Sequence, residues 1–333
     1  MKDILKTLIK FTLAFGLIFY LTKSGRLNFS ILSEMSKYPT KFVITLLCFF
    51  LILCIVNLRY SLILSTKLSK KIPITRLLRY NWIGMFFNSV LPGSVSGDFV
   101  KIFYIKDEDK KLNMKFMFGS VIVDRILGLV GLVIILGVST VINYEKLTNL
   151  SPDIKKLLDL NLVLFTLVIT ALACVIFFQK LPSIILNPLS KINITYKFFS
   201  KILSLWDALC QFRPIMIKLI ALSIILQSLS IIVFWYLAES FSNGSFTIDH
   251  ALSLVPVGFI TIAIPISPAG LGVGHAVFHS LLGLVGITNG ADLFNLYFFM
   301  ILLFNLFGVV PYLLTKSKKQ ISFQNLDDHN EEI

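Results

Sequence analysis

The stretch "NSVLPGSVSGDFVK", residues 88–101, interrupts an apolar run that would otherwise be read as a membrane span. Residues 80–91 are mostly apolar, but about 12 helical residues extend only roughly 18 Å, and a hydrocarbon core is about 30 Å thick. Pro92 and Gly93 then break the run, and Asp98 adds a carboxylate. The sequence therefore predicts a segment that enters the membrane and turns back, with an acid at the break.

The composition places the whole chain in a membrane. Of 333 residues, 56% are hydrophobic and 15% charged, and the mean hydropathy is +0.83. A soluble core cannot bury so much apolar surface, so the predicted fold class is an all-α polytopic helix bundle. The four cysteines lack metal-ligand spacing, and no nucleotide-binding or catalytic motif is visible. We therefore expect no cofactor, no metal and no catalytic residues.

Six apolar runs are long enough to cross a bilayer, and two further apolar regions, 80–98 and 251–288, are broken. The full runs cover residues 4–22, 42–63, 116–141, 160–179, 215–239 and 291–314. The first of them lacks a small-residue cleavage site and is interpreted as an uncleaved anchor. Residues 1–320 are expected to form one transmembrane domain, followed by a polar, disordered tail at 321–333.

The placement of Lys and Arg predicts the orientation of the spans. With the N-terminus inside, the cytoplasmic segments hold 23 of the 31 basic residues and the external segments hold 7, while Arg125 lies within a span. The cytoplasmic segments are 1–10, 59–115, 180–218 and 315–333. This asymmetry favours cytoplasmic N- and C-termini, with the two broken regions on opposite sides. It also accounts for the net charge of +13 without nucleic acid as a partner.

The second broken region has an apolar arm on each side of the breaker "PISPAGLGVG", residues 265–274. Each arm has about 14 residues or fewer, which is too short to cross comfortably. Paired broken segments in the two halves of a chain are typical of a transporter's binding region, because irregular backbone within a membrane needs a protein interior or an aqueous cavity. The alternative is that the glycines and prolines only permit close helix packing.

Two adjacent ionisable residues, Asp124 and Arg125, lie within an apolar span. Each is costly to bury in a bilayer, so both are expected to have partners or to contact water. Neighbouring residues on a helix do not face each other, so the two partners should differ. Asp98 is one candidate partner for Arg125, and a lipid phosphate is the other. A structural ion pair near the interface remains an equally good interpretation.

The segment 194–212 differs from the spans because its apolar residues fall on one helical face. This pattern predicts an interfacial helix on the membrane surface. A helix packed on the bundle fits the same pattern.

Three stretches resemble the lysylphosphatidylglycerol synthase transmembrane region, also called the flippase-like domain family: "NSVLPGSVSGDFVK", "GSVIVDRILGLVGL" and "IPISPAGLGVGHAVF". The family includes the membrane half of the multiple peptide resistance factor. The resemblance implies a helical bundle with re-entrant segments, and Asp98, Asp124 and Arg125 match its motif positions. Family members often carry Arg-Glu where this chain has Gly274 and His275. The soluble aminoacyl-transfer domain is absent, so a stand-alone member is expected.

The broken segments and buried charges, taken with the family resemblance, imply a lipid translocase of the plasma membrane and not an enzyme. Its expected substrate is an anionic or aminoacylated phospholipid, or a polyprenyl-phosphate lipid. Its partners would be membrane lipids and a separate lipid-modifying enzyme or glycosyltransferase. An integral-membrane glycosyltransferase and an accessory protein of lipid or glycan synthesis are the alternatives. The candidate substrate-binding residues are Asp98, Lys101, Asp124, Arg125, Pro92, Gly93, Gly97, Pro268, Gly270, Gly272 and His275.

Overall fold

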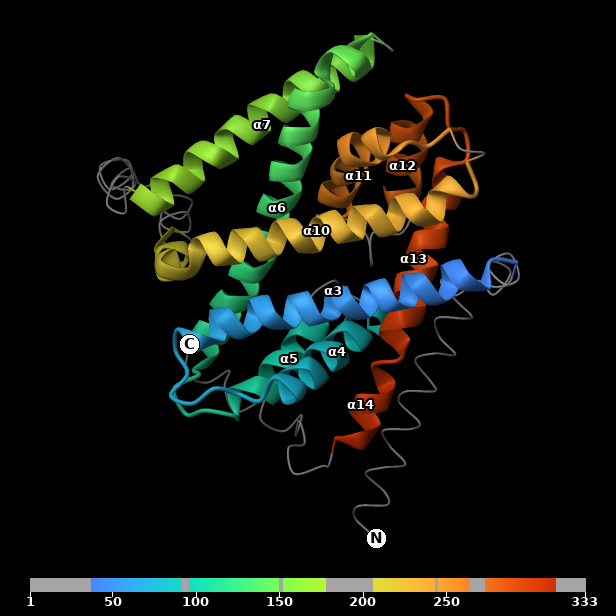
Figure 1. The fold of residues 1–333 in the computed structure, drawn as a ribbon. Helices are drawn as coiled ribbons and strands as arrows, with labels where there is room; N and C mark the ends of the chain where they lie inside the picture. The colour runs from blue at the N-terminus through green and yellow to red at the C-terminus, as the bar shows by residue number, and fades with distance from the viewer. Residues whose placement is uncertain are drawn as a thin grey trace.

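The computed structural model describes residues 37–91, 96–149, 152–177, 206–242, 245–263 and 273–315, and the secondary structure in these ranges is helical (Figure 1). The main elements are α3 (Pro39–Ser65), α4 (Ile74–Val90), α5 (Ser96–Lys106), α6 (Met114–Thr148), α7 (Pro152–Phe177), η1 (Arg213–Ile215), α10 (Met216–Glu239), α11 (Ile248–Ala263), α12 (Val273–Gly283), α13 (Gly290–Leu306) and α14 (Val309–Leu314). The all-α polytopic fold is therefore confirmed.

Five helical segments within the described ranges are long and apolar enough to cross a membrane. They are Pro39–Ser65, Met114–Thr148, Pro152–Phe177, Arg213–Glu239 and Gly290–Leu314. These correspond to five of the six predicted spans. The sixth, at 4–22, lies outside the described residues, as do most of the segment 194–212 and the tail at 321–333.

Helices α3 and α10 lie side by side and run in opposite directions across the middle of the molecule (Figure 1). At one end Lys41 of α3 pairs with Glu239 of α10 at 2.9 Å. Near the other end Arg59 of α3 donates to Ser223 of α10 at 2.8 Å. The two contacts join opposite ends of the helices, so they establish the antiparallel arrangement.

The connections 66–73 and 107–113 meet at one end of the bundle, where the backbone N–H of Ser69 donates to Asp109 at 2.7 Å. These two connections carry five lysines, Lys67, Lys70, Lys71, Lys110 and Lys111. We call this end of the molecule the lysine-rich end. Helix α6 starts here and leads to the opposite end, where α7 begins after a short connection.

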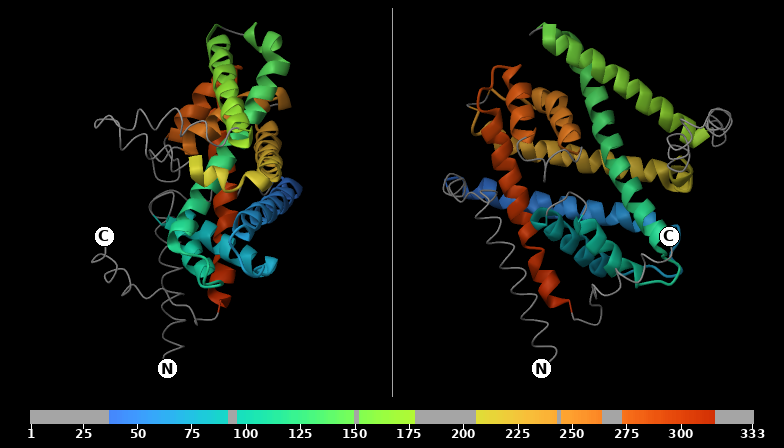
Figure 2. Two further views of the ribbon diagram at one scale, coloured as in Figure 1. Left: turned by 90° about the vertical axis from the view of Figure 1, so that its left-hand side faces the viewer. Right: turned by 180° about the vertical axis from the view of Figure 1, so that it is seen from behind.

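Helix α7 contacts α6 and leaves most of its surface exposed (Figure 2). Leu160, Val163 and Leu167 are each more than half exposed. An apolar face of this kind suits contact with lipid, as expected for a spanning helix at the edge of a bundle.

The first break is confirmed, because α4 ends at Val90 and α5 begins at Ser96. The two helices pack against each other as a hairpin, with Gly97 of α5 against the backbone of α4 at Gly84. Helix α4 begins at Ile74, directly after Pro73, and is therefore longer than the apolar stretch 80–91 from which the break was predicted. Asp98 lies just after the break, in the first turn of α5, where the helix dipole favours a carboxylate.

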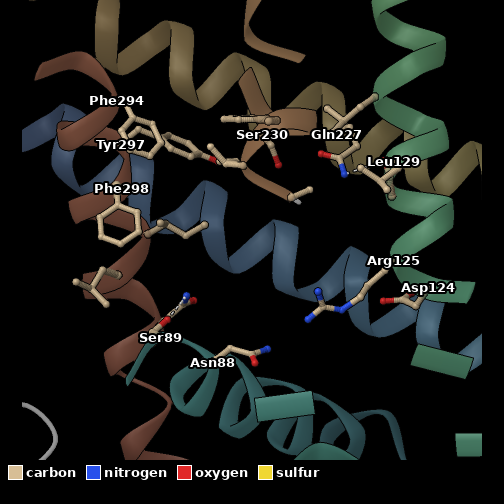
Figure 3. A pocket seen from close by; sticks show the side chains of 18 of the residues that line it. Asn88, Ser89, Asp124, Arg125, Leu129, Gln227, Ser230, Phe294, Tyr297 and Phe298 are labelled. Carbon is tan, nitrogen blue, oxygen red and sulfur yellow. Dashed lines mark hydrogen bonds between the residues drawn. The ribbon is translucent and has the colours of Figure 1, made fainter. Parts of the chain in front are cut away.

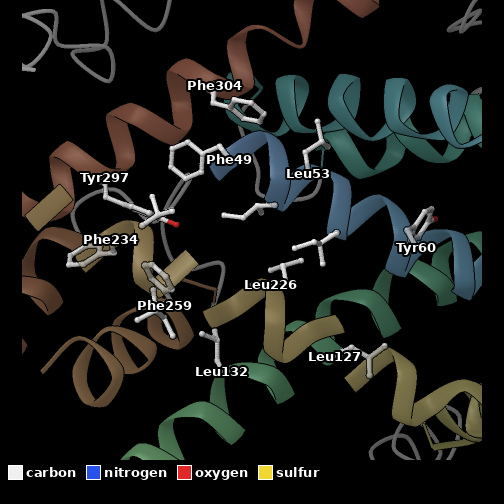
Figure 4. Close-up of a cluster of buried hydrophobic side chains, with 14 of the residues drawn as sticks. Phe49, Leu53, Tyr60, Leu127, Leu132, Leu226, Phe234, Phe259, Tyr297 and Phe304 are labelled. Carbon is white, nitrogen blue, oxygen red and sulfur yellow. The ribbon is translucent and has the colours of Figure 1, made fainter. Parts of the chain in front are cut away.

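A second helical hairpin, α11 and α12, comes from the opposite end of the bundle and leaves residues 264–272 between its arms. Aromatic rings fix it in place (Figure 4). Phe278 of α12 stacks on Phe234 of α10 at 4.9 Å and on Phe294 of α13 at 5.0 Å between ring centroids. The Phe278 side chain is fully buried in the core, so the second hairpin is anchored against α10 and α13.

The last span bends between α13 and α14, at residues 307–308. Pro311 lies four residues after Phe307, and a proline ring displaces the carbonyl at this position and removes one backbone donor. Pro311 thus accounts for the bend. Trp82 of α4 stacks on Phe304 of α13 at 5.3 Å, which holds the first hairpin against this span.

Candidate functional site

A cavity of about 700 Å³ lies where the two hairpins approach each other within the bundle (Figure 3). The ends of both arms contribute to it: Asn88 and Ser89 from α4, and Ile262 and Ala263 from α11. The remaining lining residues come from α3, α6, α10, α11 and α13, and are Arg59, Asp124, Arg125, Gly128, Leu129, Leu132, Gln227, Ser230, Phe259, Phe294, Tyr297, Phe298, Ile301, Leu302 and Asn305. Such a position is where paired broken helices place a binding site in transporters.

Arg125 projects into this cavity from α6 and pairs with Asp98 of the first hairpin. Its Nη2 lies 2.5 Å and its Nε 3.0 Å from Oδ2 of Asp98. The Asp98 side chain is 12% exposed, whereas the Arg125 side chain is 41% exposed. The geometry therefore confirms Asp98 as a partner of Arg125, whose side chain is partly exposed.

Asp124, the neighbour of Arg125 in sequence, has a different partner, as predicted. Arg59 Nε donates to Asp124 Oδ1 at 2.9 Å, and Arg59 Nη1 donates to Ser223 at 2.8 Å. Both charged side chains are largely buried. The predicted cytoplasmic segment 59–115 includes Arg59, but this assignment is wrong, because Arg59 lies within the spanning helix α3. Its position inside the apolar run 42–63 already indicates an arginine within a span.

Lys101 lies one turn after Asp98 on α5 and is 8% exposed. Its Nζ is 3.6 Å from Oδ1 of Asp98 and 4.0 Å from the centre of the Tyr60 ring. A cation over an aromatic face is stabilised by the ring quadrupole, which partly offsets its burial. The hydroxyl of Tyr60 is itself hydrogen-bonded to Ser120 at 3.0 Å, so the ring is fixed.

The charged residues beside the cavity form one cluster: Arg59, Lys101, Arg125, Asp98 and Asp124. Three cations and two carboxylates give the cluster a formal charge of +1 among the described residues. The excess positive charge is adjacent to the partly exposed Arg125. The arrangement can therefore accept an anion with fewer electrostatic costs than a cation.

The remaining cavity wall includes amide and hydroxyl groups, and the aromatic rings of Phe294, Tyr297 and Phe298 lie away from Arg125 (Figure 3). Asn305 donates to Ser89 at 2.9 Å, and its Oδ1 has no hydrogen-bond partner in the part of the chain that the structure describes. Gln227 donates to the Gly128 carbonyl at 3.1 Å. These amides and the Ser89 hydroxyl were not predicted as site residues, because polar residues in spans more often join helices, and both amides do so as well.

Of the other predicted site residues, the structure describes Gly97 and His275. Gly97 lies at the contact between α4 and α5, and its N–H donates to Asn88 at 2.8 Å. His275 lies in the first turn of α12, with its ring edge-on to Phe294 at 5.2 Å, and so contacts the cavity wall rather than lining it. Pro92, Gly93, Pro268, Gly270 and Gly272 are outside the described residues.

The spans, the two opposed hairpins and the cavity between them define a multi-pass membrane protein. The lysylphosphatidylglycerol synthase TM region matches residues 7–314, so the chain belongs to this family. The family supports a function related to membrane lipids. No curated protein and no solved structure matches the chain.

Proposed function

We propose that the protein is a lipid translocase that moves a phosphate-bearing lipid between the leaflets of the plasma membrane. The observation that supports this most is Arg125, a partly exposed cation in a cavity between the ends of two hairpins. Arginine binds phosphate through two parallel hydrogen bonds, and here the same fork is directed at the Asp98 carboxylate. Asp98, Lys101, Asp124 and Arg125 form the proposed headgroup site.

The lining of the cavity suits a lipid that has a polar head and apolar chains. The charged side chains of Asp124 and Arg125 lie on one side, and Phe294 and Phe298 lie on the other (Figure 3). A translocase needs a polar path for the headgroup only, because the chains can remain in the bilayer. The proposed substrate classes are anionic and aminoacylated phospholipids and polyprenyl-phosphate lipids.

The proposed orientation puts the lysine-rich end in the cytoplasm, together with both termini. The first hairpin then enters from the cytoplasm and the second from outside. A separate lipid-modifying enzyme or glycosyltransferase would supply or consume the lipid.

Transport by purified protein in proteoliposomes tests the proposal. A fluorescent phospholipid is placed in one leaflet, and its arrival in the other is followed by dithionite quenching. We expect the wild-type chain to accelerate exchange and Arg125→Ala to abolish the acceleration. Lys156→Ala is the control, because Lys156 pairs with Asp153 on the exposed surface of α7.

Absence of exchange by wild-type protein with every lipid class would contradict the translocase proposal. It would instead favour the accessory role. Equal exchange by wild-type protein and Arg125→Ala would exclude Arg125 as the phosphate ligand.

A further inference from the structure

We infer that the site accepts a phosphodiester headgroup with a net charge of −1, and that Lys101 holds Asp98 while the lipid phosphate occupies Arg125. This inference deepens the proposed function and rests on it for the location of the site. Asp98 is then an internal substitute for the ligand, and Lys101 is a positioning residue.

The two oxygens of Asp98 face two different cations. Oδ2 lies 2.5 Å from Arg125 Nη2, and Oδ1 lies 3.6 Å from Lys101 Nζ. The first distance is a close charge-assisted hydrogen bond, and the second is longer than a normal hydrogen bond. Asp98 is thus bound to Arg125, with Lys101 one small displacement away.

An anion that binds Arg125 must compete with the Asp98 carboxylate. Without Lys101, this competition would leave a carboxylate of 12% exposure without a close cation, which is strongly unfavourable. Lys101 removes most of that penalty, because shortening its distance to Asp98 replaces the lost ion pair. Tyr60 holds Lys101 in place for this exchange by lying beneath its ammonium group at 4.0 Å.

The charges of the cluster set the preferred charge of the headgroup. Arg59, Lys101 and Arg125 exceed Asp98 and Asp124 by one positive charge, which a single phosphodiester neutralises. Asp124 is the only carboxylate among the described cavity-lining residues, and Arg59 already binds it at 2.9 Å. An ammonium group on the ligand would therefore find no available carboxylate in the described lining, and its charge would add to the excess.

Three lipids test the charge preference because they share a phosphodiester and differ in net charge. Phosphatidylglycerol carries −1, phosphatidylcholine 0 and lysyl-phosphatidylglycerol +1 at neutral pH. Each is titrated into the purified, detergent-solubilised chain, and binding is measured by native mass spectrometry. We expect phosphatidylglycerol to bind about tenfold or more tightly than either of the others.

Variants of Lys101 test the exchange. Lys101→Met should weaken phosphatidylglycerol binding by about tenfold, and Lys101→Arg should restore most of it. Lys41→Met is the matched control, since Lys41 also pairs with a carboxylate, that of Glu239, and lies over a tyrosine ring, that of Tyr236. We expect the control to bind phosphatidylglycerol as the wild-type chain does, and thermal unfolding to establish that each variant is folded.

Equal binding of the three lipids by wild-type protein would overturn the inference without any variant. Unchanged phosphatidylglycerol binding in a folded Lys101→Met variant would exclude the exchange. Displacement of bound lipid by inorganic phosphate would assign the site to a free anion instead. Selective binding of phosphatidylglycerol without leaflet exchange would uphold the inference and reject the translocase function. Leaflet exchange without selective binding would uphold the translocase function and reject the inference.

Discussion

Gly97 and Gly84 face each other across the first hairpin with no room for a side chain on Gly97. A Cβ added there would overlap the carbonyl oxygen of Gly84 and crowd Asn88, whereas a Cβ on Gly84 would lie 3.1 Å from the carbonyl oxygen of Gly97. Gly97 also lies next to Asp98. The close approach of α4 and α5 at Gly97 therefore fixes the position of the Asp98 carboxylate in the candidate site.

Gly97→Ala should destabilise the protein more than Gly84→Ala. Backbone atoms surround Gly97 and must shift, at a typical cost for overpacking of about 1–3 kcal/mol. Gly119→Ala is the control, because a Cβ there meets no atom within 4 Å and alanine favours the helix. Thermal unfolding in detergent measures the three variants. A Gly97→Ala protein as stable as the control would show that the helices do not pack this closely.

Removing one partner of the buried Arg59–Asp124 pair should be costly. The Arg59 side chain is only 6% exposed, and Asp124→Asn leaves it without its carboxylate partner. We therefore expect the free energy of unfolding to fall by about 3–5 kcal/mol. The double variant Arg59→Met with Asp124→Leu should recover much of this loss. The exposed pair Lys156–Asp153 offers a control cycle with a coupling near zero. If denaturant unfolding gave similar coupling for both pairs, the Arg59–Asp124 pair could not be desolvated.

The lysine-rich end should face the cytoplasm. In a chain with its four native cysteines replaced, a cysteine at Lys110 should react with an impermeant maleimide only after cells are opened. A cysteine at Asn149, at the opposite end of α6, should react in intact cells. Labelling of Lys110→Cys from outside would reverse the orientation, and with it the direction from which each hairpin enters.

The sequence was sufficient for the five spans that the structure describes and for the first break. Long apolar runs leave few alternatives in a membrane, because every backbone polar group must be paired within the segment. The separate partners of Asp124 and Arg125 were also predictable, because adjacent helical residues point in different directions.

The composition of the cavity could not be predicted in the same way. Arg59 and Ser223 are 164 residues apart in sequence, and only the antiparallel packing of α3 and α10 brings them together. Asn88 and Asn305 each form a hydrogen bond between helices and also line the cavity. Sequence patterns of one helix do not distinguish these roles, since the difference depends on which neighbouring helix leaves a gap.

Exchanging the charges of Asp98 and Arg125 separates a structural ion pair from a phosphate site. Arg125 is 41% exposed and Asp98 keeps Lys101 nearby, so Arg125→Ala should remain folded, at a cost of about 1 kcal/mol. The double variant Asp98→Arg with Arg125→Asp restores an opposite-charge pair but moves the cation from α6 to α5. A structural pair tolerates this change at least in part, although Lys101 then lies beside a second cation, whereas a ligand phosphate loses its binding partner.

We therefore expect the exchanged protein to fold and to lose lipid movement in proteoliposomes, as Arg125→Ala does. Arg125→Lys is the matched variant, because it keeps the charge on α6 and loses the planar fork, and it should retain partial activity. Lipid movement at a near wild-type rate in the exchanged protein would exclude Arg125 as the headgroup ligand. The ion pair with Asp98 would then be purely structural, and the phosphate would have to bind elsewhere in the cavity.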